Sequence, residues 1–214
     1  MWEVFKTLQA GGFMMYVNFG ISMSVVAIVI LRTYQLWFQY RMSTSSFADS
    51  VVASVDQGNY ANAVQLASQK AHHPLGAIIK DILLKADKSD KEIERAYEAS
   101  SSREIPRLKR FTAYLPQAGN LATLVGLLGT IHGLIEAFGG ATAEDAAERQ
   151  QVLAKGITVA FYNTFFGLAI AVFCAITFIV LNGRQNMILE GMENAINRIR
   201  ERILDRNRQM RSAR

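Results

Sequence analysis

Polar side chains lie inside two long apolar stretches of this sequence, 121–135 and 156–180. The first stretch holds Thr123 and Thr130. The second holds four polar side chains within two helical turns: Thr158, Tyr162, Asn163 and Thr164. Such groups hydrogen-bond the preceding turn or a neighbouring helix, or they relay water and protons along a polar path. Packing is the favoured interpretation for a single threonine, but two clusters in neighbouring stretches favour a path.

The first stretch also carries three closely spaced glycines: Gly126, Gly129 and Gly133. Gly129 and Gly133 form a small-xxx-small pair, which lets two helices approach closely in a membrane. This pattern predicts tight helix packing and does not by itself indicate an activity.

Three windows of the sequence lack Asp, Glu, Lys and Arg, namely 7–31, 111–135 and 156–183. A helix rises about 1.5 Å per residue, so each window is long enough to cross a hydrocarbon core of roughly 30 Å. The sequence therefore predicts an all-α integral membrane protein with three transmembrane helices. Because the N-terminus lacks the basic region and cleavage pattern of a signal peptide, we expect the first window to remain as an anchor.

The charges between the windows predict the orientation. Residues 32–110 and 184–214 are rich in Lys and Arg, whereas residues 139–155 are poor in them. The positive-inside rule then places the two basic regions in the cytosol, N-out and C-in. The expected segments are a short external segment (1–12), transmembrane helix 1 (13–31), a cytosolic helical domain (32–110), transmembrane helix 2 (111–138), an external loop (139–155), transmembrane helix 3 (156–183) and a basic cytosolic C-terminal helix (184–214).

The expected cytosolic domain shows the apolar spacing of short helices, interrupted by turn signals. We expect a broken helix from about 91 to 138 that leads into the second span, with Ser89 or Asp90 as its N-cap. His72 and His73 precede Pro74. We expect them in a solvated turn rather than a metal site, because no Cys and no further His lies at a helical offset nearby.

Two basic features flank the spans. Arg32 ends the first window, and we expect it to snorkel to the membrane surface as an anchor. The C-terminal helix carries eight Arg and four acidic residues, together with an apolar stripe. The stripe predicts packing on the other cytosolic helices, with binding to anionic membrane lipid as the alternative. Nucleic-acid binding is disfavoured, because the tail has no aromatic residues and no binding motif.

No Asp, Glu, Lys or Arg lies deep in any expected span, and His132 and Glu136 lie toward the outer end of the second span, 111–138. If this chain conducts protons, a partner must therefore supply the titratable group. The sequence has no glycine-rich phosphate loop, no catalytic-triad spacing and no metal-ligand cluster. We therefore expect neither an enzyme nor a cofactor. A path lined by threonines and poor in carboxylates is compatible with H⁺ as the coupling ion.

Two segments resemble the signatures of the MotA/TolQ/ExbB proton-channel family. They are 124–134 (LVGLLGTIHGL) and 156–168 (GITVAFYNTFFGL), and the approach 103–110 (REIPRLKR) is also similar. Order, topology and spacing agree over about residues 10–205. Three spans with a modest cytosolic region resemble the TolQ/ExbB branch more than the four-span MotA branch.

The resemblance implies a homopentamer around a pore, which holds two copies of a single-span TolR-, ExbD- or MotB-like partner. Each partner would bring a membrane aspartate. The complex would be a motor or stator of the bacterial inner membrane, driven by the proton motive force to do mechanical work on the cell envelope. The match places the pore-facing threonines at Thr130 and Thr164. ExbB-type members have a glutamate where this sequence has Val159, which leaves Tyr162 and Asn163 as candidate replacements.

Two other functions stay open from the sequence. One is a membrane scaffold ring that conducts nothing. The other is a subunit of a solute transporter, which the absence of a midplane charge and of an inverted repeat disfavours. The energised process also stays open among nutrient uptake or protein transport, envelope constriction, gliding and flagellar motility.

Overall fold

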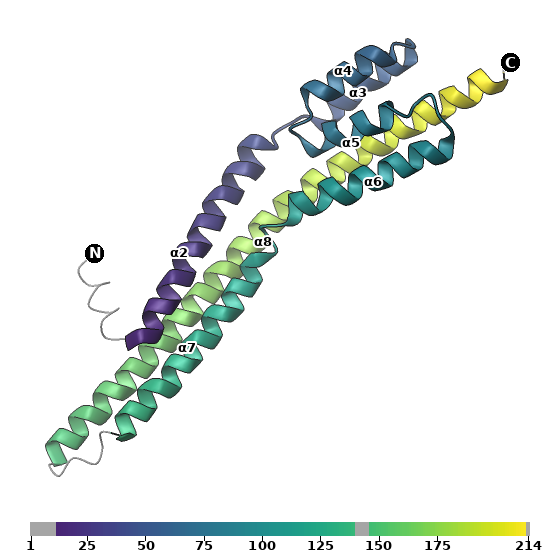
Figure 1. Cartoon of the computed structure of the whole chain (residues 1–214). Helices are drawn as coiled ribbons and strands as arrows, with labels where there is room; N and C mark the ends of the chain where they lie inside the picture. The colour runs from purple at the N-terminus through teal and green to yellow at the C-terminus, as the bar shows by residue number, and fades with distance from the viewer. Residues whose placement is uncertain (1–11, 140–145, 213–214) are drawn as a thin grey trace. The chain divides into compact units, whose positions relative to one another are not determined.

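The computed structural model describes residues 12–139 and 146–212 (Figure 1). It is 89% helical and has no strand in these residues, which confirms the predicted all-α class. The helices are α2 (Gly12–Tyr34), the π-helical turn η1 (Gln35–Gln39), α3 (Thr44–Asp56), α4 (Tyr60–Gln69), α5 (Pro74–Leu83), α6 (Asp90–Lys109), α7 (Tyr114–Gly139) and α8 (Ala146–Ser212).

The chain divides into two compact units. The first, here called the membrane unit, comprises Met1–Arg32 and Phe111–Val180. The second, here called the polar unit, comprises Thr33–Arg110 and Leu181–Arg214. The described chain has three helices that are long and apolar enough to span a membrane, and each overlaps one of the three uncharged windows. The prediction of three spans is therefore confirmed.

α8 begins earlier than the sequence suggested. We expected residues 139–155 to form an external loop, but residues 146–155 belong to α8. This segment contains no Gly or Pro before Gly156 and is rich in Ala, Glu, Gln and Leu, which are strong helix formers. Glu148 lies in the first turn, where a negative charge stabilises the positive end of a helix.

α2 buries a stripe of residues at spacings of three and seven: Met15, Asn18, Val25 and Arg32. Arg32 is 1% exposed, and its Nε and Nη2 donate to Oγ1 of buried Thr112 at 3.0 and 2.9 Å. The expectation that Arg32 snorkels to the surface is therefore wrong. Thr112 lies in the turn between α6 and α7. The Arg32 guanidinium therefore hydrogen-bonds a buried hydroxyl group of the protein and not the membrane surface.

Polar caps mark the beginnings of the short helices. Ser89 caps α6 through a capping box with Glu92, which confirms one of the two predicted caps. His73 caps α5: its Nδ1 accepts a hydrogen bond from the backbone N–H of Leu75 at 3.1 Å. The expected solvated turn is wrong for His73, which is 6% exposed, and burial lowers its pKa to about 4. The described residues contain no cluster of potential metal ligands.

The core of the polar unit joins α5 and α6 with the second half of α8. α5 buries one apolar face, and α8 contributes Met192, Ile196, Ile199 and Ile203, each at most 1% exposed. The burial of this stripe confirms that the basic helix packs on other helices. Ion pairs flank it: Arg198–Asp49, Arg200–Glu94 and Arg202–Asp56, with N–O distances of 2.6, 3.0 and 2.5 Å.

Candidate functional site

A seam of small residues brings α7 against α8 in the membrane unit. Gly126 and Gly133 are buried on α7, and a Cβ at either would lie 2.9–3.0 Å from backbone atoms of α8. Gly167 of α8 is equally close to α7, because a Cβ there would lie 2.6 Å from the carbonyl oxygen of Ala122. Gly126, Gly129 and Gly133, the three glycines that the sequence singles out, each have atoms of α8 within 3.0 Å of where a Cβ would lie. The sequence reasoning did not single out the matching glycines on α8.

Thr130 and Thr164 contact each other across this seam. Their hydroxyl groups form a hydrogen bond, and Thr130 Oγ1 also donates to the carbonyl oxygen of Gly126 at 3.0 Å. Either hydroxyl can be the donor of the Thr130–Thr164 hydrogen bond, and Thr164 is the donor when the single Thr130 proton is on the Gly126 carbonyl oxygen. In that arrangement the hydrogen bonds run from Thr164 through Thr130 to Gly126, and the lone pairs of the Thr164 oxygen remain to accept a further hydrogen bond.

Asn163 of α8 packs in the interface between α7 and α8. It is 1% exposed, and its Nδ2 donates to the carbonyl oxygen of Val159 at 3.0 Å. Its side chain occupies the notch at Gly129, where a Cβ would come within 2.5 Å of Asn163 Cγ. Asn163 thus packs the seam one residue away from the threonine pair.

The structure does not bring the other three predicted path residues to the threonine pair. Thr123 and Thr158 donate to carbonyl oxygens of their own helices, those of Gly119 and Ala154, at 3.1 and 2.7 Å. Tyr162 is 42% exposed on α8. For Thr123 and Thr158 the structure shows the hydrogen bond to the preceding turn that an isolated threonine commonly makes.

Two pockets flank the seam at opposite ends of α7. One, of about 510 Å³, is lined near the end of α7 by Glu136 and by Lys155 and Val159 of α8. A glutamate of α7 and Val159 of α8 thus line the same pocket. The other pocket, of about 360 Å³, lies near the beginning of α7 and is lined by Gly119, Asn120 and Cys174.

Sequence reasoning also missed Asn18 in the first span. Asn18 is 0% exposed, and neither polar atom of its side chain has a hydrogen-bond partner among the residues that the structure describes. The available signal was its position seven residues before Val25 and fourteen before Arg32, on the stripe that α2 buries.

Comparison with known proteins identifies the fold that carries this site. The sequence model of the MotA/TolQ/ExbB proton channel family matches residues 68–194, more than half of the chain. The chain belongs to this family. The match includes α7 with the threonine pair, the seam glycines and most of α8. Family membership and three apolar helices make this chain a multi-pass inner-membrane protein with a channel-type function in energy transduction.

Several curated relatives carry ExbB in their names. The chain is 30% identical to the ExbB-like 3 biopolymer transport protein of Synechocystis over 169 residues, which cover 77% of this chain and 78% of the relative. It is 26% identical to an ExbB homolog of Methanothermobacter thermautotrophicus, over 85% of this chain and 63% of that protein. A segment of 54 residues, 25% of this chain and 24% of the relative, is 50% identical to the biopolymer transport protein exbB1 of Vibrio cholerae.

Proposed function

We propose that this chain is the pore-forming subunit of a proton-motive-force-driven complex of the inner membrane. Five copies form a ring, N-out and C-in, and two copies of a single-span ExbD/TolR-like protein lie inside it. Protons pass between the ring and a membrane aspartate of the partner, and the resulting movement does mechanical work on the cell envelope. The observation that carries this proposal is the hydrogen-bonded pair of Thr130 and Thr164, contributed by two different spans.

The composition of the spans supports a two-component path. The windows 111–135 and 156–183 contain no Asp, Glu, Lys or Arg, so the chain itself offers no carboxylate beside the threonine pair. A proton that crosses a membrane through protein needs a titratable group or ordered water near the midplane. In the proposed complex the partner aspartate is that group, and the threonines are the polar surface it meets.

The direction of the hydrogen bonds defines which state of the aspartate the pair prefers. When the Thr130 proton is on the Gly126 carbonyl oxygen and the Thr164 proton is on Thr130, the lone pairs of Thr164 are left to accept from a new donor. A protonated carboxyl group donates and an ionised one only accepts. The pair in this geometry therefore binds the neutral aspartic acid, the form in which a carboxyl group crosses the membrane midplane at least cost.

Proton flux into proteoliposomes tests this function. The chain is co-purified with the ExbD-like protein of its own genome, and a potassium diffusion potential drives protons toward a pH-sensitive dye inside the vesicles. We expect Thr164→Val to lower the flux at least about tenfold, on the scale of one lost polar contact to a charge-carrying group. Thr164→Ser keeps the hydroxyl and should retain most of the flux.

Thr177→Val is the matched control, because it removes the same hydroxyl from α8 thirteen residues away. It should leave the flux unchanged. Native mass spectrometry of the same preparation gives the subunit count, for which we expect five chains with two partners. Flux that survives Thr130→Val and Thr164→Val together would contradict the path. A ring whose unmodified form carries no flux would support the non-conducting scaffold instead.

A further inference from the structure

A cationic pocket lies in the polar unit where α8 leaves the third uncharged window. Its volume is about 160 Å³, several times the roughly 30 Å³ that one water molecule takes in the liquid. Its polar lining comes from Tyr40, Arg41, Thr44 and Arg184, and Met187 and Ile188 form an apolar wall. Two guanidinium groups from segments far apart in the sequence thus line one small space.

The two arginines of this pocket differ from four arginines of the C-terminal helix. Arg198, Arg200, Arg202 and Arg208 each lie within 4.0 Å of a carboxylate oxygen. Neither Arg41 nor Arg184 forms an ion pair with a carboxylate in the described part of the chain. The Nε of Arg184 is buried and has no hydrogen-bond partner among the described residues. The pocket is therefore lined by two arginines that have no carboxylate partner among the described residues.

Trp37 fixes Arg184 beside the pocket. The Arg184 guanidinium carbon lies 5.8 Å from the centre of the Trp37 ring, within the range of a cation–π interaction. Stacking on a ring leaves the edge of the guanidinium, with its N–H groups, able to bind an anion in the plane. Trp and Tyr near arginine are typical of the headgroup level of a membrane, and Trp37, Tyr40 and Arg41 follow the first span closely.

The sequence places this pocket at headgroup level. Arg184 is the first residue after the window 156–183, and Arg41 follows the end of the window 7–31 by ten residues. The phosphate group of a phospholipid lies at this depth in each leaflet. A carboxylate of a soluble partner does not lie at this depth unless that partner binds the membrane surface. Depth and charge therefore favour a phospholipid.

We propose that this pocket binds the phosphate of an anionic phospholipid, between the guanidinium groups of Arg41 and Arg184. The lipid glycerol and acyl chains run along the apolar wall of Met187 and Ile188, and Tyr40 and Thr44 offer hydroxyl donors to the phosphate oxygens. This inference does not depend on proton conduction, and it gives the chain a specific lipid ligand.

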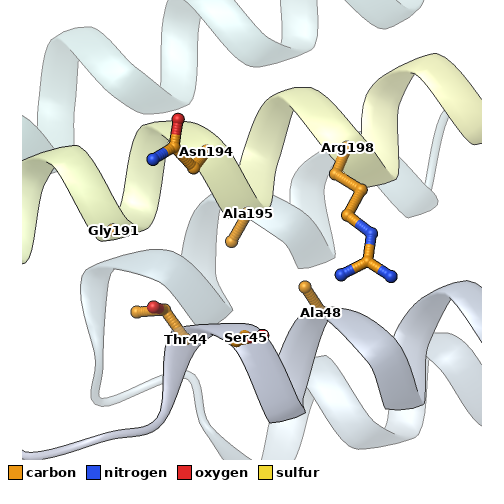
Figure 2. Close-up of a pocket in the computed structure, with 7 residues that line it drawn as sticks. All are labelled: Thr44, Ser45, Ala48, Gly191, Asn194, Ala195 and Arg198. Atoms are coloured by element: carbon orange, nitrogen blue, oxygen red, sulfur yellow. The ribbon is translucent and has the colours of Figure 1, made fainter.

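An adjoining pocket has room for the rest of the headgroup. It has a volume of about 210 Å³ and shares Thr44 and Gly191 with the cationic pocket. Figure 2 shows it between α3, which carries Thr44, Ser45 and Ala48, and α8, from which Arg198 reaches toward α3. Gly191 keeps α8 close here, because a Cβ at this position would lie 3.0 Å from Thr44 Oγ1. Hydroxyl groups around this space suit a polyol headgroup such as glycerol.

Native mass spectrometry of the purified full chain tests the proposal. The delipidated chain is titrated with phosphatidylglycerol and, in parallel, with phosphatidylcholine of the same acyl chains, and the fraction of chain with one bound lipid is measured. Each basic residue near a lipid phosphate strengthens binding by a factor of about five. We expect phosphatidylglycerol to bind more tightly than phosphatidylcholine, and Arg41→Gln with Arg184→Gln to weaken phosphatidylglycerol binding about thirtyfold.

Arg208→Gln is the matched control, because it removes one positive charge from the same helix where acidic residues surround it. It should leave phosphatidylglycerol binding unchanged, and Arg184→Lys, which keeps the charge, should weaken it less than Arg184→Gln does. Equal binding of the two lipids, or unchanged binding in the double variant with its helix content intact, would overturn the proposal. So would displacement of phosphatidylglycerol by an equal concentration of inorganic phosphate, because the ligand would then be a soluble phosphate.

Discussion

Asn163 of α8 fills the notch that Gly129 leaves in α7. A Cβ at residue 129 would lie 2.5 Å from Asn163 Cγ and 2.7 Å from Asn163 Cβ. Real side chains do not approach so closely. The side chain at residue 163 therefore limits the size of the residue at position 129, and the reverse also holds. The Thr130–Thr164 contact lies one residue further along both helices, and its geometry therefore depends on this fit.

The Gly129 notch predicts a rescue between two substitutions. Gly129→Ala forces Asn163 or α7 to move, and overpacking of this kind costs about 1–3 kcal/mol. Asn163→Gly removes the obstructing Cγ and Cβ, so Gly129→Ala should cost less in that background than in the unmodified chain. Thermal unfolding in detergent measures both.

Gly183→Ala is the control for the Gly129 experiment. Gly183 lies inside α8 and a Cβ there would meet nothing within 4 Å. This variant should be neutral or more stable. If Gly129→Ala lowers the melting temperature equally with and without Asn163, the notch does not explain the cost.

The buried Arg32–Thr112 contact predicts a requirement for a hydroxyl at residue 112. Thr112→Val removes the acceptor of two hydrogen bonds from a guanidinium that is 1% exposed. Loss of a partner for a buried polar group costs about 1–3 kcal/mol, and more for a charged one. Thr112→Ser keeps the oxygen and should stay within about 1 kcal/mol of the unmodified chain. Equal melting temperatures for the Val and Ser variants would show that Thr112 does not support Arg32.

His73 predicts a pH dependence of the polar unit. Burial holds its pKa at about 4, below the ordinary 6.5, so the unfolded chain binds a proton at a higher pH than the folded one. The stability from neutral His73 is therefore complete above about pH 6.5 and is lost as the pH falls from 6.5 through 4. The shift corresponds to about 3 kcal/mol. Of its neighbours, the Tyr40 backbone raises the pKa of His73 and Lys70 lowers it, and the Tyr40 ring meets the imidazole edge-on.

His73→Asn tests this dependence, because Asn is a good N-cap that does not titrate. The melting temperature of the variant should fall less steeply than that of the unmodified chain between pH 6.5 and 4. His72→Asn is the matched control, since His72 is the exposed neighbour and should keep the original slope. Identical slopes for the two variants would exclude His73 as the titrating group.

The sequence predicted the features that follow from composition and periodicity. The uncharged windows identified all three spans, and the apolar stripe of 184–214 correctly indicated packing. The burial of Arg32 was not predicted, because its hydrogen-bond acceptor, Thr112, is eighty residues away in the sequence. No local sequence pattern indicates that contact. His73 was misjudged because its burial depends on the packing of the polar unit. The contact between Thr130 and Thr164 could not be predicted from spacing within one helix. It depends on the register of α7 against α8, which the glycine seam determines.

The pocket beside the seam gives the protein a built-in spectroscopic probe. Cys174 is the chain's single cysteine, and its Cβ would lie 3.2 Å from a Cβ at Gly119 across the α7–α8 seam. The sulfhydryl stretch absorbs in a part of the infrared spectrum where proteins are otherwise nearly silent. A shift of that one band would report any sliding of the two helices during turnover, without a label and without a mutation.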